Sequence, residues 1–320
     1  MSEGLIYYHW GQPTSTTPKY GFDIRCEVLL LTRNVRIVGS EGNQGATLTT
    51  ASIIEMNDID FTLTARNGQT IIDNVELENM SQIDSENAGL RFEQATEKWH
   101  SITNCAFHHG LGWGAKVRDS ENVYLHGNII YSFVRIGITF DGVKNITFDN
   151  NFVGKLPERV PDEPRGGVLG CSFLGQKCTD LHITNNIVAG SGWTGYTTRG
   201  HSCGAQGTQQ VFRNNTAHSI QGFGGGYCIE IEVDKYEESQ LTCYAASHFN
   251  TYKCTHHGLA TYQDSRKVVI TNANSMDHFE GFTAMLATGH DEYHDFVVEI
   301  SDSNFYGETE ILDCPSSSTG

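Results

Sequence analysis

The sequence predicts an all-β fold, a right-handed parallel β-helix (solenoid) of about nine or ten turns. One observation is a short pattern that recurs along the 320-residue chain: apolar, any, apolar, any, Asn or Asp, any, any, apolar. Such alternation is typical of strands rather than helices. The other observation is the long repeat period without a helical pattern in between, which indicates a coil that adds one turn per repeat. The right hand comes from resemblance to known coils of this class.

The copies of the pattern can be placed one after another along the chain. Close copies are "HSITNCAF" (100–107), "VYLHGNII" (123–130), "ITFDNNFV" (146–153) and "LHITNNIV" (181–188). Looser copies are "TIIDNVEL" (70–77), "VFRNNTAH" (211–218), "VVITNANS" (268–275) and "VVEISDSNF" (297–305). If Val75, Cys105, Asn128, Asn151, Asn186 and Asn215 are equivalent, the steps are 30, 23, 23, 35 and 29 residues. The gap before Ala273 has room for one more copy, around 243–250.

The recurring asparagines have an architectural explanation. Asn tolerates the left-handed backbone of a bend and hydrogen-bonds nearby main chain. In stacked turns, inward Asn side chains can also bond to one another along the coil. We therefore assign a structural role to Asn128, Asn151, Asn186 and Asn215.

The chain divides into three parts. Residues 1–26 are expected to be the tail of a preceding β domain or an N-terminal cap, 27–313 the β-helix, and 314–320 a Ser/Thr-rich tail. At the first boundary, "EVLLLTRNVRIVGS" (27–40) sets a polar triplet between two apolar runs. Thr32, Arg33 and Asn34 are expected to shape a bend, with Arg33 bonding carbonyls or a carboxylate and the first strand starting at Val35.

This stretch carries a family resemblance. Glu27, Val28, Leu31 and the Leu-Thr-Arg-Asn order resemble the segment that follows the eight-glycine domain in fibrocystin, fibrocystin-L and related cell-surface and secreted hyaluronidases. The resemblance implies a parallel β-helix within a large extracellular or membrane-anchored protein. The hyaluronidases carry an Arg-Tyr-Pro-any-His-Phe-His segment. Here Asn87-Ala88-Gly89 replaces Arg-Tyr-Pro, and Arg91 and Glu93 replace the two histidines.

Composition narrows the function classes. The net charge of -17 argues against nucleic-acid binding, which requires a basic surface. No apolar run reaches the roughly 18 residues of a membrane span. Nine cysteines and the sequons at Asn79, Asn145 and Asn214 favour an extracellular or cell-surface location. Cys171 with Cys178 and Cys243 with Cys254 are spaced closely enough to be candidate local disulfides, although sequence does not determine connectivity. Because nine is odd, at least one thiol is free or pairs with another chain.

Two further groups are candidate binding sites. His108 and His109, with Lys116 and Arg118 one bend later, could hold an anionic sugar; otherwise they are turn residues. Glu230, Glu232 and Asp234 alternate along an expected strand, and three carboxylates on one face could hold Ca²⁺. The sequence predicts no cofactor apart from this candidate ion.

The leading hypothesis is a non-catalytic structural or adhesive segment of a fibrocystin-L-like surface or fibre-forming glycoprotein, able to assemble end to end. Its partners would be other extracellular proteins, copies of itself or glycans. Two alternatives stay open: a hydrolase or lyase acting on acidic glycans, and a glycan- or calcium-binding module. Paired carboxylates in an open groove would favour the hydrolase.

Overall fold

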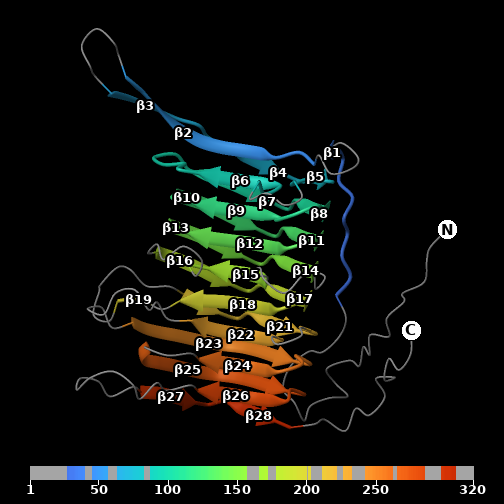
Figure 1. Ribbon diagram of the computed structural model, residues 1–320, viewed down its shortest axis with the longest axis vertical. Coiled ribbons are helices and arrows are strands. Elements are labelled where there is room, and N and C mark those ends of the chain that lie inside the picture. Colours follow the sequence, from blue (N-terminus) through green and yellow to red (C-terminus); the bar gives the residue numbers. More distant parts are fainter. Residues whose placement is uncertain are drawn as a thin grey trace, which may run out of the picture.

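Three parallel ladders of strands wind around one core in the computed structural model (Figure 1). The structure describes residues 27–39, 45–56, 63–82, 87–156, 166–171, 178–199, 201–202, 211–221, 226–232, 242–261, 265–284 and 297–307. In this part of the chain there is no helix, and so none that could cross a membrane. The predicted parallel β-helix is confirmed. The two end segments, 1–26 and 314–320, lie outside the described residues.

Each turn contributes one strand, or half of a long strand, to each ladder. Ladder 1 contains β4 (Ile71–Asp73), β7 (His100–Thr103), β10 (Glu121–His126), β13 (Lys144–Asp149), β16 (Thr179–Thr184), β20 (Val211–Arg213), the first halves of β23 (Thr242–Tyr252) and β25 (Ser265–Met276), and β27 (Val297–Ser301). Ladder 2 contains β1 (Val35–Val38), β5 (Val75–Glu78), β8 (Ala106–Gly110), β11 (Ile129–Phe133), β14 (Phe152–Leu156), β17 (Ile187–Ser191), β21 (Thr216–His218), the second halves of β23 and β25, and β28 (Asn304–Tyr306). Ladder 3 contains β2 (Leu48–Met56), β6 (Leu90–Glu93), β9 (Ala115–Arg118), β12 (Ile136–Asp141), β15 (Gly166–Gly170), β18 (Thr194–Arg199), β22 (Tyr227–Glu232), β24 (His257–Thr261) and β26 (Glu280–Ala284). Two short strands pair antiparallel beside the coil, β3 (Leu63–Asn67) with β2 and β19 (His201–Ser202) with β23.

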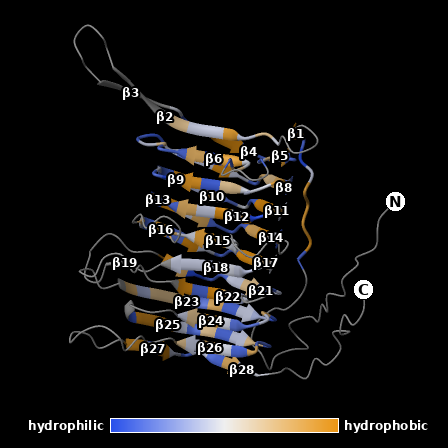
Figure 2. Cartoon of the chain, viewed as in Figure 1, coloured by the Kyte–Doolittle hydropathy of each residue, from blue (hydrophilic) through white to orange (hydrophobic). Residues whose placement is uncertain are grey.

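The registers agree with the repeats read from the sequence. Val123 of β10 pairs with Ile146 of β13, and Ile146 pairs with Leu181 of β16. The copy expected around 243–250 is present as β23. Inward side chains of all three ladders form a single large core cluster, while outward positions are mostly polar, and Figure 2 shows this alternation along the strands.

A left-handed residue makes the bend between ladders 1 and 2 in every turn. These residues all have φ between 50° and 65°. They are Asn74, Asn104, Gly127, Asn150, Asn185, Asn214, His248, Asn272 and Asp302. Asn, Asp and Gly are the residues that adopt this conformation at least cost. We expected the left-handed bend at the next residue, the column of Asn128. That expectation is wrong by one position, because Asn128 points into the core.

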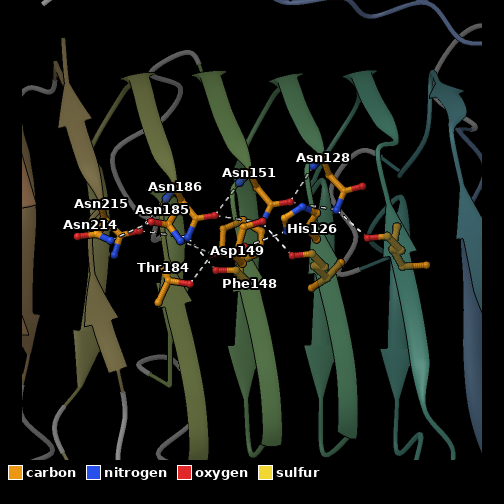
Figure 3. A network of polar contacts seen from close by, with 12 residues as sticks. His126, Asn128, Phe148, Asp149, Asn151, Thr184, Asn185, Asn186, Asn214 and Asn215 are labelled. Carbon is orange, nitrogen blue, oxygen red and sulfur yellow. Dashed lines mark hydrogen bonds and ion pairs between the residues drawn. The ribbon is translucent and has the colours of Figure 1, made fainter. Parts of the chain in front are cut away.

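The inward asparagines form a continuous hydrogen-bonded ladder (Figure 3). Asn128 donates both its main-chain N–H and its Nδ2 to Asn151 Oδ1, at 2.9 and 3.0 Å. Asn151 binds Asn186 in the same way, and Asn186 binds Asn215. The second Nδ2 hydrogen of Asn128 goes to Ile102 O at 2.9 Å. These buried amides are therefore satisfied, which a core requires of polar groups.

A column of glycines lines the corner where ladder 3 begins. A Cβ added to Gly137 would lie 2.2 Å from Val153 Cγ1 and 2.5 Å from Gly167 O. Neighbouring turns repeat this arrangement at Gly114, Gly167 and Gly195. No side chain fits here because the main chains of successive turns approach too closely.

Residues 27–34 lie lengthwise along the outside of ladder 2 as an extended segment, which we call the strap (Figure 1). At one end Glu27 Oε1 lies 3.0 Å from His218 Nε2. At the other, Arg33 Nε donates to Asn104 O at 2.7 Å and Arg33 N to Glu76 Oε2 at 3.1 Å. Arg33 also donates from Nη1 to the carbonyl oxygens of Leu30 and Thr32, at 2.5 and 2.9 Å.

Alternate strap residues face the coil. Glu27, Leu29, Leu31 and Arg33 are half-buried, whereas Val28, Leu30, Thr32 and Asn34 are exposed. The polar triplet is therefore mostly extended chain, and only Asn34 lies at a bend. The expectation that all three residues form a bend is wrong, because side chains of an extended segment alternate between two faces and this alternation accounts for the pattern. The first strand does start at Val35.

One of the two candidate disulfides is present, and the other predicted pairing is wrong. Cys171 bonds to Cys178. Cys254 bonds to Cys228 rather than to Cys243, which is disulfide-bonded elsewhere. Cys243 and Cys254 lie near opposite ends of β23, and an extended strand rises about 3.3 Å per residue, beyond the reach of a disulfide. Among the described cysteines, the buried Cys105 is free.

Candidate functional site

A group of charged and imidazole side chains lies on the outer face of ladder 2, near its N-terminal end. Glu76 and Glu78 project outward from β5, and Glu78 pairs in register with His108 of β8. Arg36 of β1 lies 2.9 Å from Glu76 Oε1 through its Nε and also contacts Glu78 Oε2 through its Nη2. Because Glu76 also accepts from Arg33, this carboxylate joins the strap, β1 and β8.

His108 and His109 contact each other directly. Their Nδ1 atoms are 2.7 Å apart and the two rings are nearly perpendicular, at 88°. His108 Nε2 lies 3.3 Å from Glu76 Oε1, within ion-pair distance but without hydrogen-bond geometry. His108 is buried, whereas His109 is exposed.

The pKa of each of these two histidines is lowered. For His108 burial is the main cause, and it outweighs the nearby carboxylate of Glu76, which acts in the opposite direction. For His109 burial is again the main cause, assisted by the charges of His108 and Lys155. Both rings are thus biased towards the neutral form, which has a lone pair free to accept a proton or a metal ion.

Lys116 and Arg118 lie apart from the two histidines. They project from the outer face of ladder 3, in register with Arg91 and Glu93 of the preceding turn. Lys116 is buried, with its Nζ 4.9 Å from the centre of the Trp113 ring. Arg91 and Arg118 share the carboxylate of Glu93, at 3.0 and 3.8 Å. The four residues predicted as one anion site thus occupy two different faces of the coil.

The acidic triplet is described in part. Glu230 is buried on ladder 3, where Thr197 Oγ1 donates to its Oε2 at 3.3 Å. The side chain of Glu232 and all of Asp234 lie outside the described residues. Among the residues that can be assessed, Glu230 does not join any group of three metal-ligating side chains.

A row of aromatic rings runs along the outer face of ladder 1. Trp99 is 49% exposed and stacks with Tyr124, their centroids 6.5 Å apart. Tyr124 stacks in turn on His126 at 5.6 Å and an interplanar angle of 6°. His126 Nδ1 lies 2.9 Å from Asp149 Oδ2, a contact visible in Figure 3. Burial alone would raise the pKa of Asp149, but bonds from Thr184, Asn185 and His126 together lower it.

The sequon asparagines all have left-handed backbone, with φ of 53° at Asn79 and Asn145 and 56° at Asn214. Asn145 and Asn214 are exposed, and each donates from Nδ2 to the Asn one turn before it, Asn122 at 2.7 Å and Asn185 at 3.0 Å. Asn79 is half-buried beside β1. Since each Nδ2 carries two hydrogens, these contacts leave one position open on Asn145 and on Asn214.

Sequence reasoning missed Glu76, Glu78 and the aromatic row. Glu76 and Glu78 lie in "ELENMSQ" (76–82), a stretch to which we assigned no role. Glu76 and Glu78 are two residues apart and so share the outward face of β5, and the β5–β8 register places them beside His108. Trp99 directly precedes one repeat copy, and Tyr124 lies within another. The repeat pattern does not specify the residue type at outward positions, so it did not identify these two rings.

The chain resembles fibrocystin in sequence. It is 25% identical to Fibrocystin of Canis lupus familiaris over 285 residues, which cover 88% of this chain and 6% of that protein. It is 26% identical to Fibrocystin-L of Homo sapiens over 301 residues, covering 87% of this chain and 7% of that protein. The resemblance predicted from the sequence is confirmed. The chain spans about 6% to 8% of the length of these curated relatives. No protein-family model matches it.

Solved structures with a similar chain path include the periplasmic alginate epimerase AlgG. Its TM-score is 0.49 at 12% identity, covering 76% of this chain and 57% of that chain. The Streptococcus pneumoniae surface protein and adhesin PfbA has a TM-score of 0.45 at 11% identity, covering 87% of this chain and 84% of that chain.

Proposed function

We propose that this chain is an extracellular, non-catalytic β-helix segment of a fibrocystin-L-like surface glycoprotein, with a structural or adhesive role. The observation that carries the proposal is the similarity to fibrocystin and fibrocystin-L, which extends over 87% to 88% of the chain rather than over one motif. A stack of turns with a satisfied Asn ladder suits a stiff spacer, because each turn is stabilised mainly by its neighbours.

The disulfides and sequons support the extracellular location. Disulfides persist in oxidising compartments, and two are present among the described residues. Secretion of the chain from cultured cells, followed by glycosidase treatment, tests the proposal. We expect a mass decrease that is smaller in Asn145→Gln and in Asn214→Gln, with less effect for the half-buried Asn79→Gln. A chain that stays unsecreted and unglycosylated would contradict it.

End-to-end assembly is part of this proposal. Apolar residues are exposed on the terminal strands: Val35, Ile37 and Ile71 at one end, and Ile300 and Phe305 at the other. Among the described strands, β1 and β28 each pair on one edge only. Unpaired strand edges with apolar side chains favour pairing with another copy. Sedimentation at rising concentration should show association that Ile71→Lys and Ile300→Lys weaken; a wild-type monomer at every concentration would exclude it.

A second candidate function is glycan binding on the aromatic row of ladder 1. The exposed ring of Trp99 and the half-buried, stacked rings of Tyr124 and His126, with the Asp149 carboxylate beside them, offer an apolar surface next to a hydrogen-bond acceptor. A glycan array with wild type and Trp99→Ala tests it. Binding lost in the variant supports the candidate, while no binding above background in the wild type excludes it. Unchanged length of incubated hyaluronan would support the non-catalytic assignment.

A further inference from the structure

The outer face of ladder 2 contains a group of ligand atoms that converge on one point. One carboxylate oxygen of Glu78 and one ring nitrogen each from His108 and His109 lie within 4.8 Å of one another. Glu78 and His108 are held opposite each other by the β5–β8 register. We propose that Glu78, His108 and His109 bind a divalent transition-metal ion, with Zn²⁺ the best fit.

The backbone explains how two consecutive histidines reach one point. In a regular strand, side chains i and i+1 project to opposite faces. His109 has φ of 55°, at the left-handed bend that ends the ladder 2 strand. This bend turns its ring back towards His108, so that the two Nδ1 atoms face each other at 2.7 Å. If an ion replaces the hydrogen between these two Nδ1 atoms, their separation must grow from 2.7 Å to roughly 3.4 Å, the distance between two nitrogen ligands of tetrahedral Zn²⁺.

The far side of the His108 ring faces a carboxylate. Its Nε2 lies 3.3 Å from Glu76 Oε1, while Nδ1 points into the group. The negative charge of this carboxylate favours the tautomer with the proton on Nε2, which leaves Nδ1 for the ion, and zinc sites commonly place a carboxylate behind a ligating histidine. Glu76 itself is held by Arg33 N and Arg36 Nε, so this support is rigid.

The donor set selects the kind of metal ion. Two imidazoles and one carboxylate suit Zn²⁺, whereas Ca²⁺ and Mg²⁺ require oxygen ligands. Arg36 contacts Glu78 through Oε2, which leaves Oε1 for the ion and reduces the local negative charge. His109 is exposed, so the fourth coordination position opens to water. Three protein ligands and one water complete a tetrahedral site.

Titration of the chelator-treated, disulfide-intact chain with ZnCl₂ tests the proposal by calorimetry and by thermal unfolding. We expect one equivalent to bind and the midpoint temperature to rise, because an ion that binds the folded state stabilises it. Affinity should fall at least about tenfold in His109→Ala and in Glu78→Gln, the range seen when even supporting residues of zinc sites are removed. His109 is exposed, so its variant should fold.

The matched control is His182→Ala, which removes an exposed histidine on ladder 1, away from the cluster. It should bind Zn²⁺ as the wild type does. Substituting Co²⁺ gives a second readout, the visible absorption of a four-coordinate ion, which should disappear in His109→Ala. Absence of Zn²⁺ binding to the wild type, or equal affinity in the wild type and His109→Ala, would overturn the proposal.

Discussion

Asn151 donates its Nδ2 hydrogen to Asn186 Oδ1 at 3.0 Å, although the two residues are 35 positions apart in the chain. The same oxygen accepts the main-chain N–H of Asn151 at 2.8 Å. One side chain therefore satisfies two donors of the neighbouring turn. Removing it leaves both donors buried without an acceptor.

Asn151→Ala should lower the free energy of unfolding by about 2 to 4 kcal/mol, because Asn128 then loses the acceptor of its main-chain N–H and of its Nδ2. Urea denaturation followed by circular dichroism measures this change. The control is Asn150→Gly at the exposed left-handed bend, where Gly is equally suited and stability should change little. Equal losses in both variants would refute a special role for the inward column.

Gly137→Ala should destabilise the coil by roughly 2 kcal/mol or more, because the added methyl meets Val153 and the Gly167 carbonyl at less than contact distance. Gly307→Ala is the matched control, since nothing lies within 4 Å of its added Cβ. Thermal unfolding of the two variants gives the comparison. A Gly137→Ala chain as stable as Gly307→Ala would show that the corner can widen.

Arg33→Ala should loosen the strap, because it removes the side-chain bonds to the carbonyls of Asn104, Leu30 and Thr32. Limited proteolysis should then cut within residues 27–34 several times faster than in the wild type, since cleavage follows local opening. Thr32→Ala, on the exposed side of the same segment, should leave the rate unchanged. If Arg33→Ala and wild type are cut at the same rate, Glu27 and the leucines alone hold the strap.

Stability should fall as the pH drops below about 6.5, the ordinary pKa of His. Burial lowers the folded-state pKa of His100, His257 and His278, and in His278 the Nδ1 accepts the Cys254 N–H at 3.1 Å. The unfolded chain then binds protons at a higher pH than the folded chain, so acid favours unfolding until the folded pKa is passed. Midpoint temperatures from pH 8 to 5 measure this. His278→Gln, which keeps an acceptor but does not titrate, should show a shallower slope; an unchanged slope would assign the effect to other groups.

The fold could be predicted because the repeat pattern reports directly on local geometry. Inward side chains must be apolar or must hydrogen-bond to one another. The column of Asn128, Asn151, Asn186 and Asn215 could therefore be recognised from the regular spacing of Asn along the chain. The left-handed residue was placed one position too late. Both neighbours are often Asn, and the pattern alone does not say which one points inward.

Features that depend on distant turns could not be predicted. The strap reads as a short alternating segment, and nothing in it identifies ladder 2 as its support. Cys243 and Cys254 are close in sequence but separated by a long strand, so the spacing suggested the wrong pair. The glycine column was a missed signal, since Gly114 and Gly137 keep the same 23-residue step as Cys105 and Asn128.

The position of the strap sets the order in which the molecule can fold. Strands of the coil pair with strands one turn away, whereas Glu27 and His218 are 191 residues apart. During synthesis the strap leaves the ribosome before the turns that it crosses. Glu27 therefore lacks its partner until the coil has extended to β21. During refolding, the Val153 amide should become protected from hydrogen exchange before residues 27–34 resist protease, so that a segment made before the coil docks after it.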